Sequence, residues 1–346
     1  MSNQNNHVNW DKVRRLSEQY GNGAIFQFYA DFEGVDPTHS ALLTDDVDIQ
    51  PPWKIPRKVA VTTAIVGAMH NKRFNPNHPM TPEEIYNSAR EACLAGAPSI
   101  HLHVRDEQGY SVLDPDLFHQ VIDPLKEEFP EVVIDGCMVC ENPREWETMK
   151  ILLKEKLFET TPVNTNATYN GDMLFCKPAH VMIEKCRLVQ EAGGIPQITF
   201  YSSADVDHAN RYLIRSGLLE KPYNFLLLYG LPGCSPMDDP IAMMHTLMNT
   251  YHQLKSIDPD CRITVCAAGR ASSFAAAQAL LMGLNIRVGM EDAVWKYPHR
   301  NDKISSNAKQ FTEACTMAGC YDSPRGSRLH GPAPENLVQG VRNNEQ

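Results

Sequence analysis

The feature that most constrains the fold is an alternation of short apolar segments with amphipathic ones, which begins at Lys58 and continues to Gly319. Each apolar segment is followed by a segment with helical periodicity. Near-continuous apolar strands that alternate with amphipathic helices are typical of parallel strands covered by helices. The eight expected strands are residues 58–65, 99–105, 132–139, 160–165, 195–202, 223–230, 262–269 and 285–290.

Eight strand–helix units in one domain predict an α/β fold, a (β/α)8 TIM barrel, whose usual size is about 250 residues. An open, doubly wound sheet is the alternative, but such a sheet usually carries a Gly-rich phosphate loop after its first strand. Here the first strand runs into AIVGAMHNKR, which lacks that motif. The barrel is therefore favoured, with the catalytic domain at residues 58–325.

The first helix of the barrel has a clear start signal. Thr81 is a typical N-cap residue, Pro82 occupies the first helical position and Glu84 lies three residues after the cap. We therefore expect this helix to begin at Pro82 with a capping box.

Two terminal segments fall outside the repeating pattern. Residues 1–57 are polar and interrupted by Asp, Asn, Gly and Pro, with one helix expected from Trp10 to Tyr20. We interpret them as an N-terminal extension that lies on the barrel or on a neighbouring subunit, and residues 326–346 as a C-terminal tail. The N-terminal region has no apolar run of the kind that directs export, so we expect a cytoplasmic protein.

Net charge and cysteine usage exclude several functional classes. The formal net charge of -10 argues against binding to nucleic acid, which needs a basic surface. No stretch of about 18 apolar residues is present, so no membrane span is expected. The 10 cysteines are scattered through the chain and are expected to be reduced thiols. Cys137 and Cys140 form one C-x-x-C motif, a weak metal or redox signal without a second pair.

Polar side chains collect at the ends of the predicted strands, which is where barrel enzymes place their active sites. In SIHLHVRD, alternate positions of one strand carry His101, His103 and Arg105, so we expect these side chains to share one face. Glu291, after the eighth strand, can complete the set, because two imidazoles and a carboxylate form a common open zinc site. A pair of hydrogen-bonded histidines in the barrel interior is the alternative interpretation.

The segment NIRVGMED supplies further candidates. Glu291 and Asp292 are adjacent and point to different places, so one can bind metal while the other acts as a base. The alternative interpretation is that these two acidic residues only cap the N-terminus of the last helix. Arg287 lies inside a strand, where a guanidinium is costly unless it meets an anion, such as a substrate or these carboxylates. Candidate substrate contacts at other strand ends are Cys137, Asn164, Thr199 and Tyr201.

These motifs resemble those of the β-keto acid cleavage enzymes over about residues 58–320. The shared pattern consists of TAIVGA after the first strand, TPEEI at the first helix, AGAPSIHLHVRDE, the YGLPG loop and NIRVGMED. The resemblance places the family's zinc ligands on His101, His103 and Glu291. It places the general base on Asp292 and an assisting arginine on Arg287.

The resemblance also implies an activity. Members of the family are zinc-dependent (β/α)8 barrels, usually homotetramers. They condense a β-keto acid with acetyl-CoA and cleave the product in a retro-Claisen step, giving acetoacetate and a new CoA ester. The implied partners are therefore a small keto acid or other carboxylate and acetyl-CoA, with Zn²⁺ as cofactor.

The sequence departs from the family at four positions around the substrate. Met69 stands where a glutamate is usual, and Thr199 replaces an acidic residue. The Ser-Thr-Gly-Gly run that helps to hold a substrate carboxylate is here 137–140, CMVC, and of a Thr-x-Asn motif only Asn164 remains. The predicted metal ligands and base are kept, whereas the segments that would hold the substrate carboxylate differ. The loss of the two acidic residues argues against a substrate that carries an amine.

Three functional hypotheses follow. The first is the acetyl-CoA-dependent cleavage reaction with an unusual β-keto acid. The second is a zinc lyase on the same scaffold, which abstracts an α proton and eliminates a β substituent or breaks a C–C bond without CoA. The third is a non-catalytic family member, which the intact metal set and the base Asp292 disfavour.

Overall fold

In a computed structural model of the chain, the described residues are 59–319, without 141–143, 166, 171–172, 232–234 and 236–238, together with six residues near the N-terminus. The chain divides into two units, Met1–Ile55 and Pro56–Gln346. In the first unit Trp10, Asp11, Arg14, Arg15 and Glu18 are helical, as the sequence predicts. The rest of the predicted extension 1–57, except Val8, and the predicted tail 326–346 lie outside the described residues.

Within the described part of the second unit, eight parallel strands close into a barrel, which confirms the predicted fold. The closing pair joins the last strand to the first, with Thr62 opposite Arg287. The barrel strands, in their order around it, are β1 (Val61–Ala64), β2 (Ser99–Leu102), β5 (Val133–Gly136), β6 (Thr160–Asn164), β9 (Ile195–Phe200), β10 (Asn224–Tyr229), β11 (Arg262–Ala267) and β12 (Asn285–Val288).

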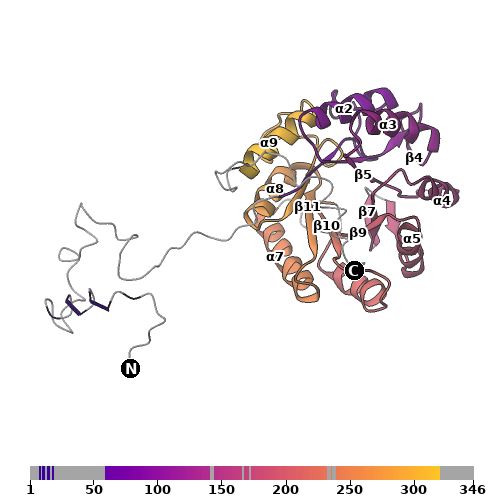
Figure 1. Cartoon of the computed structure of the whole chain (residues 1–346). Coiled ribbons are helices and arrows are strands. Elements are labelled where there is room, and N and C mark those ends of the chain that lie inside the picture. The colour runs from indigo at the N-terminus through magenta and orange to yellow at the C-terminus, as the bar shows by residue number, and fades with distance from the viewer. Residues whose placement is uncertain are drawn as a thin grey trace. The chain divides into compact units, whose positions relative to one another are not determined.

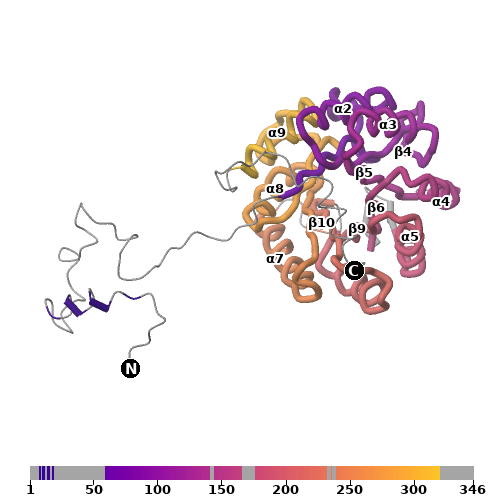
Figure 2. Tube along the Cα trace, viewed as in Figure 1, coloured from indigo at the N-terminus to yellow at the C-terminus, as the bar shows by residue number. Residues whose placement is uncertain are grey.

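Helices surround the strands in a ring (Figure 1). In Figure 2 the tube passes around this ring in chain order, and yellow α9 comes to lie beside indigo α2, with which it is in contact. The helices are α2 (Pro82–Leu94), α3 (Pro115–Glu128), α4 (Glu145–Glu155), α5 (Ala179–Glu191), α6 (Ala204–Ala209) continued by a π-helical turn (Asn210–Ile214), α7 (Pro240–Ile257), α8 (Ser272–Leu281) after a 3-10 turn (Gly269–Ala271), and α9 (Asn307–Gly319).

The predicted start of α2 is confirmed. The Glu84 amide donates to the Thr81 hydroxyl at 3.2 Å, and the Glu84 carboxylate accepts from the Thr81 amide at 3.2 Å. Pro82 occupies the first turn. These reciprocal bonds satisfy two amides at the helix start that the helix itself leaves unpaired.

The apolar strands are buried on both faces, as expected for parallel strands under a helical layer. Ile100, Ile134, Val163 and Ile198 on four neighbouring strands are completely buried. Helix side chains such as Phe118 cover the strands from outside, and Phe118 packs edge-on against Phe158 at 5.2 Å between ring centroids. This packed barrel fixes the positions of the strand ends that carry the polar side chains.

All eight barrel strands are shorter than predicted, and the predicted strand 99–105 is in addition divided in two. β2 ends at Leu102, and β3 (Val104–Arg105) instead pairs antiparallel with β4 (Ser111–Val112). The reason is the turn Asp106–Gly109, in which the Gly109 amide donates to the Asp106 carbonyl and Gly109 has a φ of 88°. A positive φ is easy for glycine, so the chain folds back here.

The β3–β4 hairpin also carries Arg105, which the sequence predicts on the same face as the histidines. Arg105 is buried, but it donates to three backbone carbonyls, those of Gly67, His70 and Gly109. These hydrogen bonds connect the loop after β1 with the β3–β4 hairpin. A second hairpin that the sequence did not predict, β7 (Ala167–Asn170) with β8 (Met173–Cys176), follows β6.

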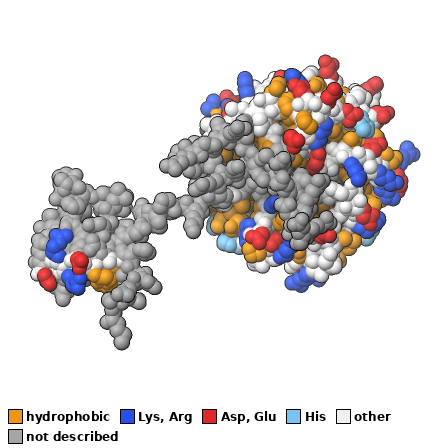
Figure 3. Space-filling model, viewed as in Figure 1, with side chains coloured by type: hydrophobic (Ala, Val, Ile, Leu, Met, Phe, Trp, Pro, Cys, Tyr) orange, Lys and Arg blue, Asp and Glu red, His pale blue; other side chains and the backbone are white. Residues whose placement is uncertain are grey.

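Charged side chains of both signs lie on the surface of the barrel unit (Figure 3). On the face drawn in Figure 3, acidic and basic side chains are interspersed over the described residues. No helix among the described residues combines the length and the apolar character needed to cross a membrane. All cysteines in this part of the chain are free thiols.

Candidate metal centre and active site

His101 lies at the C-terminal end of β2 and is fixed by a carboxylate on the neighbouring strand. In the barrel register His101 is opposite Asp135 of β5, and its Nδ1 lies 2.7 Å from Asp135 Oδ2. The Thr160 hydroxyl on β6 donates to the other oxygen of Asp135 at 2.8 Å. A carboxylate on Nδ1 fixes the tautomer and leaves Nε2 as the ligand atom, the usual outer shell of a metal-binding histidine.

His103 follows the end of β2 and is oriented by the β3–β4 hairpin. Its Nδ1 lies 3.1 Å from the Ser111 hydroxyl on β4. The rings of His101 and His103 meet edge-on, with 5.6 Å between centroids. In both rings Nδ1 has a protein partner, so Nε2 of each is the atom left to bind a ligand.

Glu291 faces both of these nitrogens from the segment after β12. Its carboxylate oxygens lie 3.1 Å from His101 Nε2 and 3.6 Å from His103 Nε2. The segment is held in place because the Met290 amide donates to the side chain of Asn307 on α9 at 2.8 Å, and the Glu291 amide donates to the Ala64 carbonyl at 3.3 Å. The structure therefore brings together the three side chains predicted as metal ligands.

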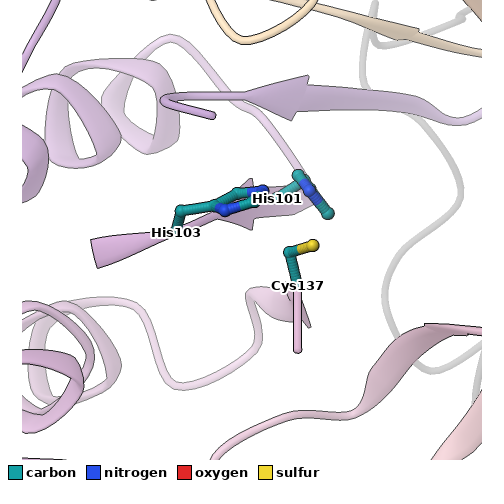
Figure 4. Close-up of side chains that lie close together, drawn as sticks. All are labelled: His101, His103 and Cys137. Atoms are coloured by element: carbon teal, nitrogen blue, oxygen red, sulfur yellow. The ribbon is translucent and has the colours of Figure 1, made fainter. Parts of the chain in front are cut away.

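Cys137 joins this group from the end of β5. The ligand atoms of His101, His103 and Cys137 all lie within 4.8 Å of one another, and the three side chains point toward one another in Figure 4. All three are buried. The sequence predicts Cys137 as a substrate contact, not as a neighbour of the histidine pair. Its place at a strand end and the C-x-x-C motif are the signals that point to this position. Cys140 does not belong to this group.

The donor set fits a metal ion such as zinc. Imidazole nitrogen, thiolate sulfur and carboxylate oxygen are its usual protein ligands. His101 Nε2 and Glu291 Oε2 are buried and make no hydrogen bond of acceptable geometry within the described residues. Buried polar atoms normally have partners, and a cation between these atoms would supply the missing interaction.

Electrostatics in the site also favour a cation. Burial disfavours the charged form of His103, but Cys137 and Glu291 raise its pKa to about 9. Burial also opposes ionisation of Cys137, but His103 and His101 lower the pKa of this thiol to about 5. His101 and Arg287 hold the pKa of Glu291 well below its usual range despite burial. A thiolate and a carboxylate thus face two imidazoles whose pKa values are raised, and a metal ion bound at their Nε2 atoms would take the place of the ring protons and interact favourably with both anions.

Arg287 and Asp292 form the second part of the site. Arg287 Nε and Nη2 donate to the two oxygens of Asp292 at 3.1 and 2.5 Å, and Nη2 lies 3.3 Å from Glu291 Oε1. The guanidinium is thus paired with both carboxylates, as its position inside a strand required. Burial raises the pKa of Asp292 to about 6 against the effect of Arg287, with a further contribution from Glu291.

The other predicted substrate contacts lie on two adjacent strands. Asn164 of β6 is opposite Thr199 of β9 in the register, and Asn164 Nδ2 donates to the Tyr201 hydroxyl at 2.5 Å. Thr199 is buried, and its hydroxyl lies 3.4 Å from the Gln197 carbonyl. The buried Asn164 Oδ1 makes no hydrogen bond within the described residues. Their contact with substrate remains a prediction.

Gly67 in the loop after β1 makes room for Glu291. A Cβ on Gly67 would clash with Cγ of Glu291. We expect Gly67→Ala to displace this carboxylate and to weaken metal binding by ~10-fold or more, because outer-sphere changes that misplace a ligand typically cost 10–100-fold. Isothermal titration with Zn²⁺ measures the change.

A double-mutant cycle provides the control for the Gly67 variant. If Gly67→Ala acts through Glu291, it should add little to the loss already caused by Glu291→Gln. Fully additive losses, or wild-type affinity in Gly67→Ala, would contradict this role of the glycine.

The fold and this site define the chain as a barrel enzyme with a chelating group at the C-terminal ends of its strands. Residues 58–324 match the family model of the beta-keto acid cleavage enzymes. The chain therefore belongs to the β-keto acid cleavage enzyme family, as its motifs indicated.

Named relatives agree with this assignment. The chain is 30% identical over 270 residues to the 3-keto-5-aminohexanoate cleavage enzyme of Acetoanaerobium sticklandii, which covers 77% of this chain and 94% of that protein. It is 26% identical over 304 residues to the 3-dehydrocarnitine:acetyl-CoA trimethylamine transferase of Rhizobium meliloti, covering 81% of this chain and 96% of that protein.

A solved structure supports the fold. The binary complex of ObcA with oxaloacetate superposes with a TM-score of 0.63 at 18% sequence identity, covering 76% of this chain and 67% of that chain. At this identity the likeness concerns the barrel architecture alone.

Proposed function

We propose that this enzyme is a zinc-dependent β-keto acid cleavage enzyme that uses acetyl-CoA. The observation that carries the proposal is that His101, His103 and Glu291 lie together at one end of the barrel beside the buried ion pair of Arg287 and Asp292. Family membership and the acetyl-CoA-dependent transferase named among the relatives support the choice of reaction.

The proposed reaction converts a β-keto acid and acetyl-CoA into acetoacetate and a new CoA ester. The α carbon of the β-keto acid loses a proton and attacks the acetyl carbonyl of acetyl-CoA, so a C–C bond forms and CoA leaves as the thiolate. The CoA thiolate then attacks the original β carbonyl and breaks the bond between that carbonyl and the α carbon. The products are acetoacetate, reprotonated at its α carbon, and the CoA ester of the remaining acyl group.

Asp292 is the proposed general base. It is buried in the site, and a carboxylate held close to a substrate's α carbon is suited to take the proton. The two hydrogen bonds from Arg287 fix its orientation, and the guanidinium offsets negative charge that develops on the substrate.

The proposed metal site would assist the removal of the α proton. His101, His103 and Glu291 are the residues proposed to hold the ion. If zinc is bound there, it would supply Lewis-acid polarisation of a substrate carbonyl oxygen. The mixed nitrogen and oxygen donors favour zinc over magnesium or calcium, which prefer oxygen ligands.

The proposed substrate is a β-keto acid without an amino group. Met69 stands in place of the family's usual glutamate and is partly exposed, and Thr199 replaces an acidic residue. Neither side chain can pair with an ammonium group. Asn164 and Tyr201 are proposed to contact the polar part of the substrate, since Asn164 Oδ1 is buried and makes no hydrogen bond in the described structure.

A lyase reaction without CoA is the second candidate. It is favoured by the CMVC segment, which lacks the hydroxyls and glycines with which the family holds a substrate carboxylate. In this reaction Asp292 would abstract an α proton, and a β substituent would leave or a C–C bond would break.

A substrate panel with and without acetyl-CoA separates the two reactions. Zinc-loaded protein is incubated with neutral β-keto acids of increasing chain length and with 3-keto-5-aminohexanoate, and acetoacetate and CoA esters are followed by mass spectrometry. We expect CoA esters only when acetyl-CoA is present, and the amino substrate to be poor. Full conversion without acetyl-CoA would overturn the cleavage reaction and support the lyase.

Three further properties belong to this proposal. The resemblance to the family supports a homotetramer, which sedimentation equilibrium can test. The partners proposed are a small keto acid or carboxylate and acetyl-CoA, with no nucleic acid and no membrane. The proposed location is cytoplasmic.

A further inference from the structure

We propose that the thiolate of Cys137 is a protein ligand of the metal, so that the chain supplies four donor groups, from His101, His103, Glu291 and Cys137. This inference rests on the metal centre proposed above and goes beyond the three ligands that the family resemblance implies. By the resemblance to the family, Cys137 begins a segment that is Ser-Thr-Gly-Gly in other members, so this fourth donor would be particular to this chain.

The geometry of the three strand ends supports the proposal. The sulfur of Cys137 and a ring nitrogen of each histidine lie within 4.8 Å of one another, close enough to surround one ion. Figure 4 shows the sulfur directed toward the imidazoles. Glu291 approaches the same two rings at 3.1 and 3.6 Å. The buried His101, His103 and Cys137 therefore form one donor group, and the partly buried Glu291 adjoins it through the two histidines.

The backbone around Cys137 holds the thiol in this position. The Cys137 amide donates to the Leu102 carbonyl at 3.3 Å, which joins the end of β5 to the end of β2 between the two histidines. The next residue, Met138, is also held in position, because the buried Lys185 of α5 donates to its carbonyl at 2.6 Å. A positioned donor of this kind needs little rearrangement to bind a metal.

A sulfur ligand has a chemical consequence. Soft thiolate ligands select zinc and other thiophilic ions, whereas a site of imidazole and carboxylate alone discriminates less. Four protein ligands would leave fewer positions on the ion for substrate than the three ligands usual for catalytic zinc. To reach the ion, the substrate would then have to bind as a fifth ligand or displace one of the four protein ligands.

Cobalt substitution tests the proposal directly. Metal-free protein is titrated with Co²⁺, and a thiolate-to-cobalt charge-transfer band in the near ultraviolet is expected for the wild type. Cys137→Ser should still bind Co²⁺ but lack the band, and should bind Zn²⁺ at least ~10-fold more weakly, by comparison with the effect of lost outer-shell partners. The matched control Cys140→Ser, altered in the same segment, should retain both the band and the affinity.

The outcomes separate this inference from the proposed function. Co²⁺ bound without the band in wild-type protein, or a band unchanged in Cys137→Ser, would overturn the thiolate ligand and leave the three-ligand centre intact. Failure of the wild type to bind Co²⁺ or Zn²⁺ at all would overturn the metal centre itself. If Cys137→Ser does not fold, zinc-edge X-ray absorption of the wild type decides, since a sulfur ligand lies at about 2.3 Å and its absence would contradict the proposal.

Discussion

His101→Ala is expected to abolish metal binding and turnover together. This imidazole is completely buried, its Nδ1 is bound to Asp135 and its Nε2 faces Glu291. Its removal takes away one proposed metal ligand and leaves the carboxylates of Asp135 and Glu291 without the imidazole that lies between them. Metal content by plasma mass spectrometry and turnover of the best keto acid should both fall to background.

The matched control for this variant is His119→Ala. His119 lies on α3, partly exposed, in an ion pair with Asp123. Surface ion pairs of this kind contribute little to stability, so metal content and activity should stay at wild-type levels. Full metal occupancy in His101→Ala would show that the ligand assignment is wrong.

Asp292→Asn is expected to separate metal binding from chemistry. The amide keeps the size of the carboxylate and a hydrogen-bonding oxygen for Arg287, but it cannot accept a proton from the substrate. Metal content should stay near the wild-type level while kcat falls by ~10²–10⁴, the usual contribution of a general base. Solvent deuterium exchange at the α carbon, followed by NMR, should fall in parallel.

The control for Asp292→Asn is Asp207→Asn, an exposed aspartate on α6 that pairs with Arg211. This change should leave both kcat and α-carbon exchange at wild-type values. An unchanged kcat in Asp292→Asn would exclude Asp292 as the base, whatever the metal content.

The barrel could be predicted because its signals are local. Each strand is a short apolar run and each helix has its own periodicity, so the order of elements is visible without any knowledge of contacts. The start of α2 is the clearest case, since Thr81, Pro82 and Glu84 determine the cap from within one turn. The placement of His101 and Glu291 at strand ends followed from the fold itself.

What the sequence did not show depends on register and on turns. Asp135 orients His101 because the two residues are opposite each other on adjacent strands. The sequence of either strand alone does not determine this register. Cys137 reaches the histidines for the same reason. The early end of β2 depends on a turn closed by Gly109, for which the sequence offers only the short segment DEQG.

Acetyl-CoA labelled with carbon-13 at its acetyl carbonyl tests the central claim most directly. If the enzyme condenses a β-keto acid with acetyl-CoA and then cleaves the product, the label must appear at the keto carbon of acetoacetate, and the new CoA ester must be unlabelled. Label in the new CoA ester, or substrate consumed while all label remains in acetyl-CoA, would contradict the proposed reaction.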